Sequence, residues 1–327
     1  MNRCLERPTV CVFCGDSAAH TTQAAFEELG TAAPSLSVSH GRTHPASSQN
    51  PFTKFSRRLT KLLRHEGPRM GLFVRPDGFV SVVAVLLLAE NHQFSISDVF
   101  SIVSTDAKQR FQLGIAEVPP STSLPSAVGL QKSMRILPAG GVCCMQCTGG
   151  AATVYIRATQ GHSIPNVQSD LLCCCINSSE ELEDALLNGP AGALRERAQA
   201  RGVTLVHGTY LRLWESIKNE GLKRMGRRHV HFTPFYGAWT GSLSDISLTS
   251  RNKVEDTEEN KSLGCFSGFR ASCNLLLILD FEKALGMGLK FFVAANGVVL
   301  TEGTEEGIVP FCCIRTSVDR RTGESLS

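Results

Sequence analysis

The sequence has no long apolar run, little net charge and no regular spacing of cysteines. No stretch of about 18 apolar residues occurs, and the longest apolar-rich segment, 79–89, is interrupted by Ser81, so we expect no membrane span. Residues 1–7 mix acidic and basic side chains without an apolar core, which does not fit a secretory signal. The net charge is only +3 over 327 residues, so any surface for nucleic acid must be local.

Cysteine and glycine patterns exclude two further classes. Several of the 13 cysteines are adjacent, as at 173–175, which fits a reducing compartment, and we expect an intracellular protein, nuclear or cytoplasmic. Cys11-x-x-Cys14 and Cys144-x-x-Cys147 have metal-ligand spacing, but no supporting ligands stand near them, and we predict no metal site. No Gly-x-Gly-x-x-Gly opens a helix after a strand, so a Rossmann dinucleotide site is excluded.

The first structured segment is predicted to be a basic amphipathic helix. Apolar residues recur every three or four positions from Phe52 to Leu63, which indicates a helix that buries one face. Between 52 and 76 there are seven Lys or Arg and one acid, Glu66. Without acidic partners at four-residue spacing, such a face is costly unless it meets an anion. The basic residues of the predicted helix are Lys54, Arg57, Arg58, Lys61 and Arg64.

Two more helices and a strand follow. We expect one helix over 82–91 and another with Ser97 or Asp98 as its N-cap, before a strand over 108–113. Helices followed by a pair of strands are the order of a winged-helix domain. The strand that completes the pair, 154–156, ends at Arg157 and is followed by a turn at 160–163.

The second half of the chain is predicted to form a mixed, split sheet with few helices. Ser178-x-x-Glu181 is a capping box, and a strand over 203–210 precedes a helix over 211–220. A basic turn, 223–228, enters a strand that carries His229 and His231. An apolar strand over 275–279 and a hairpin with an Asn296-Gly297 turn complete the pattern.

With two domains as the natural expectation for this length, we divide the chain at these patterns. The stretches rich in polar and irregular sequence are taken as an extension, two insertions and a tail. The predicted parts are a poorly ordered extension at 1–50, a lobe at 51–163 with an insertion at about 114–152, a lobe at 164–315 with an insertion at about 236–265, and a tail at 316–327.

Four stretches together resemble the signatures of the RNA 2′-phosphotransferase family, and they occur in the family's order. The family consists of NAD-dependent enzymes that remove the 2′-phosphate left at tRNA splice junctions. Here Thr159 stands where the family usually has asparagine, which leaves the amide hydrogen bond at that position without its donor. The stretches are Leu62-Leu63-Arg64-His65 followed by Arg75-Pro76-Asp77-Gly78, then Ile156-Arg157-Ala158-Thr159-Gln160-Gly161-His162-Ser163, then His207-Gly208-Thr209, and finally Arg227 before His229-Val230-His231.

The resemblance implies an α+β protein with an N-terminal winged-helix lobe and a C-terminal ADP-ribosyltransferase-like split β-sheet lobe. It also implies NAD and 2′-phosphorylated RNA, such as spliced tRNA, as substrates, and we expect a monomer. Arg227 is preferred to Arg224 and Arg228 because the family's arginine lies two residues before the first histidine of His-Val-His. The implied catalytic residues are Arg64, His65, Arg157 and Arg227; those for NAD are His207, Gly208 and Thr209; those for the RNA backbone are Lys54, Arg58 and Lys61.

The chemistry implied by this resemblance consumes NAD. The RNA 2′-phosphate displaces nicotinamide from the NAD ribose, and a neighbouring ribose hydroxyl then attacks the phosphorus. Guanidinium groups suit the second step, because charge builds on phosphoryl oxygens there. Two alternatives remain from the sequence: an NAD-dependent ADP-ribosyltransferase acting on nucleic-acid ends, and a winged-helix nucleic-acid-binding protein without catalysis.

Overall fold

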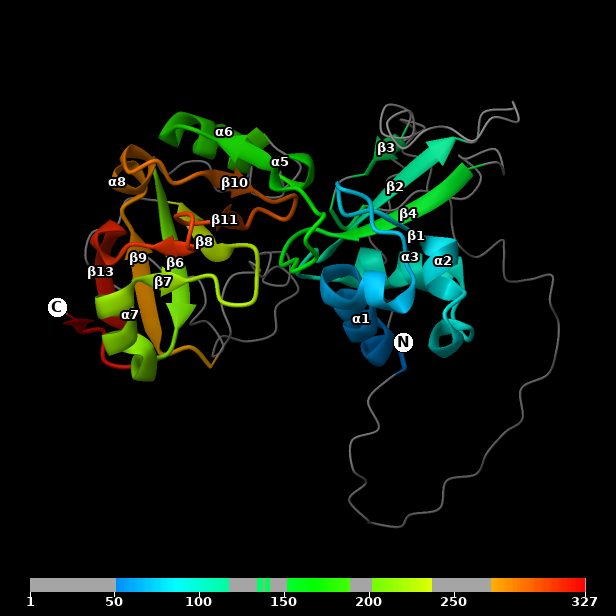
Figure 1. The fold of residues 1–327 in the computed structure, drawn as a ribbon, viewed down its shortest axis with the longest axis horizontal. Helices are drawn as coiled ribbons and strands as arrows, with labels where there is room; N and C mark the ends of the chain where they lie inside the picture. Colours follow the sequence, from blue (N-terminus) through cyan, green and yellow to red (C-terminus); the bar gives the residue numbers. More distant parts are fainter. Residues whose placement is uncertain are drawn as a thin grey trace, which may run out of the picture.

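The computed structural model describes residues 51–117, 134–137, 139–141, 152–188, 202–236 and 272–326. They form an α+β protein of two lobes that lie side by side, each with its own sheet and apolar core (Figure 1). In this part of the chain, no helix has the length and apolar character needed to cross a membrane. The expected extension, most of the two expected insertions and both Cys-x-x-Cys pairs lie outside the described residues.

The first helix, α1 (Pro51–Lys61), confirms the amphipathic pattern. Phe55 and Leu59 are buried, and the Phe55 ring stacks on Phe94 with ring centroids 3.9 Å apart. The helix then widens into a π-helical turn, Leu62–Glu66, in which the backbone N–H of Gly67 donates to the carbonyl of Leu62. Such turns hold one residue more than an α-turn and frequently lie at functional sites. No feature of the apolar spacing predicted this change.

The next two helices differ from the prediction at their ends. The second is shorter than the predicted 82–91, and a 3₁₀ turn at Ala89–Asn91 follows it. The N-cap of the third is Ser95, so the choice of Ser97 or Asp98 was wrong. Asp98 is instead the partner in a capping box: its carboxylate accepts the N–H of Ser95 at 2.7 Å, and its own N–H donates to Ser95 Oγ at 3.2 Å. These helices are α2 (Val82–Leu86) and α3 (Ile96–Thr105).

A small antiparallel sheet packs against these helices. Its two long strands, 111–117 and 152–158, pair along their whole length. They flank the expected insertion, so the expectation that these two strands lie together is confirmed. The strand predicted at 108–113 begins later, at Phe111, because Gln109 adopts a positive φ of 46° in the preceding turn, and it extends to Glu117. A short strand lies inside the expected insertion. In order across the sheet, the strands are β1 (Val80–Ser81), β4 (Ala152–Ala158), β2 (Phe111–Glu117) and β3 (Met134–Ile136).

The C-terminal lobe is built on a larger sheet. Within the described residues it has eight strands, and each described pairing is antiparallel, so the expectation of a mixed sheet was wrong. The predicted hairpin is present, with Gly297 at φ 80° in its turn. The strand order is β14 (Ser325–Leu326), β13 (Ile314–Asp319), β9 (Leu275–Leu279), β6 (Val203–Thr209), β8 (Val230–Tyr236), β11 (Val299–Thr301), β10 (Phe291–Val293) and β5 (Cys174–Ile176), and β7 (Leu222–Lys223) pairs separately with β12 (Ile308–Val309).

Short helices flank this sheet. Ser178 caps one of them as predicted, since its Oγ accepts the N–H of Glu181 at 3.1 Å. The helix predicted at 211–220 begins as a 3₁₀ turn, Leu211–Leu213, and ends before Gly221. The helices are α5 (Ser169–Leu172), α6 (Ser179–Asn188), α7 (Trp214–Glu220) and α8 (Phe281–Gly286).

Half of the segment expected to be a C-terminal tail, 316–327, lies in strands. Residues 316–319 belong to β13 and residues 325–326 form β14, and β13 pairs with β9 in the interior of the sheet. Ser317 and Val318 are buried there. The polar composition of the segment concealed a strand whose partner, β9, lies far away in the sequence.

Candidate active site

Arg64 projects from the π-helical turn toward the junction of the two lobes. Its guanidinium packs on Gly161, where an added Cβ would lie 3.3 Å from Cζ, and Gly161 has a positive φ of 87°. The Nε and Nη2 atoms of Arg64 are buried and have no hydrogen-bond partner in the described residues. These two nitrogens form one edge of the guanidinium, the edge that binds a phosphate or carboxylate with two parallel hydrogen bonds.

Arg227, in the C-terminal lobe, lies close enough to Arg64 to affect its pKa. The pKa of Arg64 is lowered to about 10, first by burial and next by repulsion from Arg227. Arg227 is exposed in the turn between β7 and β8, where Met225 has a positive φ of 57° and is 81% exposed. Two guanidinium groups held close enough to repel each other favour a bound anion.

The two rival arginines have structural contacts. The side chain of Arg224 lies over Gly307. Residue 307 must be glycine, because its φ is 78° and an added Cβ would lie 2.2 Å from Arg224 Nε. Arg228 donates to the carbonyl of Pro165 at 2.9 Å and forms an ion pair with Glu302 at 3.4 Å. Its N–H donates to the carbonyl of His162, which fixes the turn against the N-terminal lobe.

His65 lies beside this pair of cations. Its Nδ1 hydrogen-bonds Ser163 Oγ at 2.8 Å, and the N–H of Ser163 donates to the carbonyl of Arg64. Burial, followed by the charges of Arg64 and Arg227, lowers the pKa of His65. The structure therefore brings Arg64, His65 and Arg227 into one electrostatic group.

Arg157, which was expected to bind the same phosphate, makes hydrogen bonds inside the N-terminal lobe, and its charge acts together with that of Arg64 on His162. It lies on β4 directly opposite Gln112 of β2, and both Nε and Nη2 donate to Gln112 Oε1, at 2.9 and 2.7 Å. Nη1 donates to the carbonyl of Asp77 at 2.8 Å, and the guanidinium lies over the ring of Phe79. The side chain is 5% exposed, and four of its five N–H groups donate to acceptors inside the protein.

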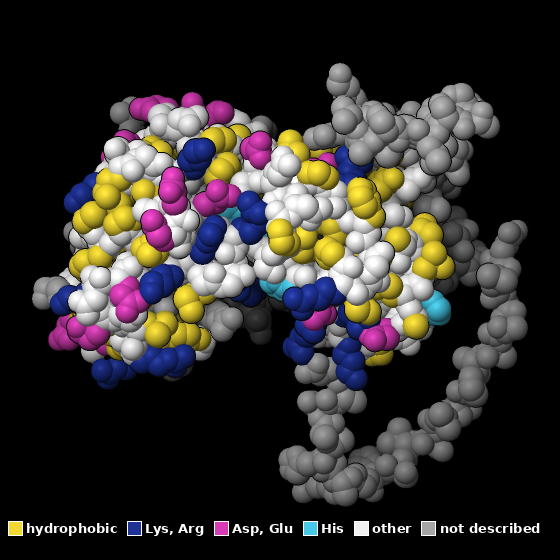
Figure 2. Space-filling view, in the orientation of Figure 1, with side chains coloured by type: hydrophobic (Ala, Val, Ile, Leu, Met, Phe, Trp, Pro, Cys, Tyr) yellow, Lys and Arg dark blue, Asp and Glu magenta, His cyan; other side chains and the backbone are white. Residues whose placement is uncertain are grey.

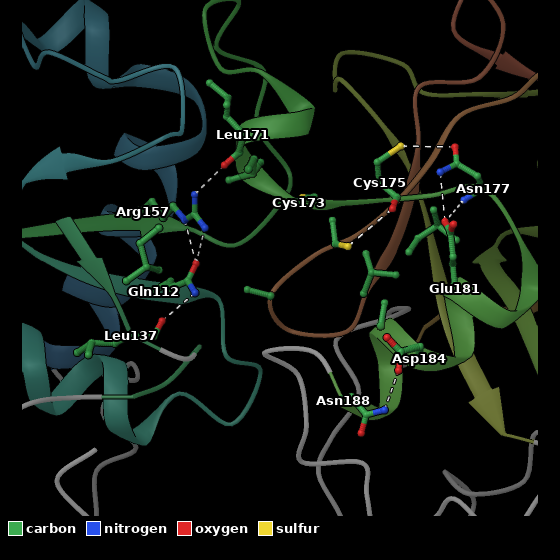
Figure 3. Close-up of a pocket in the computed structure, with 17 residues that line it drawn as sticks. Gln112, Leu137, Arg157, Leu171, Cys173, Cys175, Asn177, Glu181, Asp184 and Asn188 are labelled. Carbon is green, nitrogen blue, oxygen red and sulfur yellow. Dashed lines mark hydrogen bonds between the residues drawn. The ribbon is translucent and has the colours of Figure 1, made fainter. Parts of the chain in front are cut away.

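Figure 3 shows Arg157 pointing toward Gln112 and Leu171 at the wall of a cavity. This cavity, about 920 Å³ in volume, lies between the β2 and β3 strands of one lobe and α5, β5 and α6 of the other. Arg64, His65, Arg227 and His207 do not line it. The cavity is therefore separate from the cationic group.

His207 stands near the end of β6, as expected. Its Nδ1 donates to the carbonyl of His231 at 2.8 Å, and His231 Nε2 donates in turn to Gln160 Oε1 at 2.7 Å. Burial is the main cause of the lowered pKa of both histidines, and the charge of Arg227 lowers each further. With the proton on Nδ1, neutral His207 presents Nε2 as a hydrogen-bond acceptor. Gly208 and Thr209 complete the strand, and Thr209 is buried.

His162 and His229, from two different signature stretches, lie close to each other in the interior. His162 is 0% exposed, and neither ring nitrogen has a partner in the described residues. Burial, followed by the charge of Arg64, lowers the pKa of His162 to about 3. His229 Nε2 donates to Ser169 Oγ, and Ser169 donates to Glu302 at 2.5 Å. Neutral histidines thus fill the interior next to the arginines.

The match to a family model decides the family. The model described as "RNA 2'-phosphotransferase, Tpt1 / KptA family" matches residues 50–303. The chain belongs to this family. It is 33% identical to "tRNA 2'-phosphotransferase 1" of Mus musculus, over 82% of this chain and 77% of the relative. The proteins of the same name from Danio rerio and Homo sapiens are 30% and 29% identical, over 79% and 83% of this chain and 82% and 78% of theirs.

The basic helix of this phosphotransferase is more neutralised than its sequence indicated. Arg58 forms an ion pair with Glu90 and donates to Asn91 at 3.0 Å, and Lys61 pairs with Glu66 at 2.7 Å. Neither acid lies at four-residue spacing along the helix: Glu66 is five residues after Lys61, and Glu90 comes from the 3₁₀ turn Ala89–Asn91. Lys54 is exposed on the same face. Figure 2 shows Lys and Arg side chains gathered over α1 and at the junction of the lobes.

Sequence reasoning did not single out Gln160, His162 and Glu302, which lie beside the candidate site residues. Gln160 and His162 lie inside a recognised signature, which was a usable signal. Glu302 had none, since it follows β11 and meets Ser169 only through the folding of the lobe. Thr159, which replaces asparagine, uses its hydroxyl to bond the carbonyl of Gln109 at 3.1 Å and so ties the turn to the start of β2.

Proposed function

We propose that this chain transfers the 2′-phosphate of RNA, in the form left by tRNA splicing, to NAD. The products are RNA with a 2′-hydroxyl, nicotinamide and ADP-ribose 1″,2″-cyclic phosphate. The observation that carries the proposal is the buried Nε and Nη2 edge of Arg64, which has no partner in the described residues and faces the charge of Arg227. Two guanidinium groups, one of which has two buried N–H donors without acceptors, are suited to binding a phosphate dianion.

We assign the lobes accordingly. Helices followed by the β2 and β4 pair support a winged-helix lobe for RNA, and the antiparallel sheet that presents His207 supports an ADP-ribosyltransferase-type lobe for NAD. Exposed ion pairs are weak, so Lys61 remains available to the RNA backbone in addition to Lys54. Arg58 contributes less there, because it is held by Glu90 and Asn91.

Phosphate binding is assigned to three side chains. Arg64 donates two parallel hydrogen bonds to the phosphate, and Arg227 adds a second guanidinium. His65 donates a hydrogen bond or transfers a proton in the second step. Its lowered pKa in the free protein rises when a dianion arrives, because the anion offsets the repulsion from Arg64 and Arg227. Arg157 becomes a positioning residue that fixes the strand leading into Gln160 and His162.

The NAD ribose is assigned to His207. Its Nε2 accepts a ribose hydroxyl while its Nδ1 is held by the carbonyl of His231. Gly208 and Thr209 bring the backbone of the strand end beside the dinucleotide. His207 can accept this hydrogen bond only when its ring is neutral. Its lowered pKa, caused mainly by burial, agrees with a neutral ring.

The first step depends on position more than on a base. A phosphate dianion is already a nucleophile, so holding it beside the anomeric carbon of the ribose supplies most of the catalysis. Nicotinamide leaves, and the phosphate becomes a diester. In the second step the adjacent ribose hydroxyl attacks phosphorus, its proton leaves, and the RNA 2′-oxygen departs as a hydroxyl. Arg64 and Arg227 stabilise the charge on the phosphoryl oxygens in this step.

The test is incubation of the purified chain with NAD and an oligonucleotide that bears an internal 2′-phosphate. We expect loss of the phosphate in step with release of nicotinamide. Release of nicotinamide with the phosphate retained as a stable ADP-ribosyl product indicates the alternative ADP-ribosyltransferase. Binding of RNA with no consumption of NAD indicates the non-catalytic alternative, and either result overturns the proposal.

A further inference from the structure

Three sulfur atoms meet on the outer side of the C-terminal lobe. Met287 is the C-cap of α8, and Cys312 and Cys313 end the 3₁₀ turn Phe311–Cys313 that leads into β13. Cys312 Sγ lies 3.6 Å from Met287 Sδ, and Cys313 Sγ lies 3.3 Å from the same atom. Figure 1 shows α8 and β13 away from the junction of the lobes. The cluster is therefore separate from the phosphotransferase site.

The backbone holds this cluster in place. The N–H of Asp280, the N-cap of α8, donates to the carbonyl of Cys313 at 2.7 Å, which ties the start of the helix to the turn. Cys313 is buried in the lobe's core, whereas Cys312 is exposed and Met287 is 48% exposed. One sulfur is thus fixed, and two can adjust at the surface.

The ligand set selects a class of ion. Among the described residues, no three His, Cys, Asp or Glu side chains are grouped to hold a metal ion, which disfavours zinc with its usual four nitrogen or sulfur ligands. Two thiols with a thioether form a soft set that suits monovalent copper.

The spacing is also suitable. With metal–sulfur bonds of about 2.3 Å, a three-coordinate ion needs its sulfurs about 4.0 Å apart. The observed separations of 3.3 and 3.6 Å reach that value by a small outward shift of Met287 and Cys312. Methionine has three rotatable bonds and adapts readily to such a shift.

We propose that Cys312, Cys313 and Met287 form a surface site for a monovalent soft metal ion, Cu(I). Binding replaces the two thiol protons by the metal: one Cu(I), two thiols and the thioether give a complex of net charge −1 and release two protons, with no change of oxidation state. Lys283 and Asp280 both lie near Cys313. The Lys283 ammonium offsets part of this negative charge, and the opposing Asp280 carboxylate is paired with Arg315 at 3.5 Å.

The proposal is tested with Ag(I), which has the same charge and ligand preference and no redox chemistry under the conditions used. The full chain is labelled with ¹³C at the methionine methyl groups, and Met287→Leu assigns the Met287 signal among the six methionines. We expect Ag(I) to shift the Met287 signal. Cys312→Ser should weaken this response at least tenfold. Because Cys312 is exposed, this variant should fold, and a urea unfolding midpoint equal to that of the wild type verifies that it does.

Other cysteines can also bind silver, so Cys174→Ser serves as the matched control. Cys174 is an exposed cysteine on β5, outside the sulfur cluster, and its loss should leave the Met287 response unchanged. The proposal is overturned if the Met287 signal stays in place until all thiols are saturated, or if it moves equally in Cys312→Ser. Neither result depends on phosphotransferase activity.

Discussion

Gln160 and His231 join the two lobes through one hydrogen bond: His231 Nε2 donates to Gln160 Oε1 at 2.7 Å. The carbonyl of the same histidine accepts the Nδ1–H of His207. The signature that follows β4 is thereby connected to the residue assigned to NAD, because Gln160 orients the histidine whose backbone fixes the tautomer of His207.

Replacing Gln160 by leucine should therefore impair the use of NAD. A buried hydrogen bond contributes about 1 kcal/mol, so kcat/KM for NAD should fall about fivefold. The matched control is Gln168→Leu, since the Gln168 side chain is exposed and makes no capping bond to α5. Equal kcat/KM values in wild type and Gln160→Leu would show that this connection has no effect on the NAD site.

Arg157→Met should destabilise the fold. The substitution leaves Gln112 Oε1 and the carbonyl of Asp77 buried without their donor, at about 1–3 kcal/mol for each unsatisfied group. Urea unfolding should show a loss of about 2–4 kcal/mol, whereas the exposed Arg227→Met should change stability by about 0.5 kcal/mol or less. An Arg157→Met protein as stable as wild type but unable to bind phosphorylated RNA would restore Arg157 as a phosphate ligand.

The sequence predicted much of this molecule and failed where distant segments meet. Local patterns identified α1, β6, the Ser178 cap and the Asn296-Gly297 hairpin, because each depends on neighbouring residues. The environment of Arg157 depends on the register of β2 against β4, which no local pattern specifies.

The same reason explains the other misses. The ion pair of Arg58 with Glu90 links α1 to a separate 3₁₀ turn. The strand β13 pairs with β9, which is distant in the sequence, as well as with the nearby β14. The signature residues indicated where the cations Arg64 and Arg227 should meet, and both act on His65. They did not indicate which of the arginines would be occupied by internal hydrogen bonds.

Stability should fall as pH decreases from 6.5, since His162 is buried as a neutral ring. Its folded-state pKa of about 3 lies below the unfolded value of 6.5, so the unfolded chain binds a proton that the folded chain does not. This contribution is fully present above pH 6.5 and is lost progressively as pH falls toward 3. Urea unfolding between pH 5 and 6.5 measures the slope.

His162→Asn should reduce that slope by up to about 1.4 kcal/mol per pH unit, the value for one proton. The matched control is His92→Asn, which removes an exposed histidine in place of the buried one, and the slope of His162→Asn is compared with the slope of this variant. Identical slopes in wild type and His162→Asn would mean that His162 takes up its proton without unfolding the chain.

The central claim is that Arg64, His65 and Arg227 act on the phosphate while His207 acts on NAD. The most direct measurement is a single-turnover reaction with end-labelled RNA, in which starting RNA, ADP-ribosylated RNA and dephosphorylated RNA are resolved over time. Arg64→Ala and Arg227→Ala should slow the second step at least as much as the first, since loss of one preorganised donor costs about 3 kcal/mol, and at least one should accumulate ADP-ribosylated RNA. His207→Ala should leave the RNA unreacted and release no nicotinamide, and Arg321→Ala, at an exposed arginine, should react as the wild type does. If both arginine variants fold and yet leave only starting RNA at every time point, the arginines serve substrate binding alone and the division of roles is contradicted.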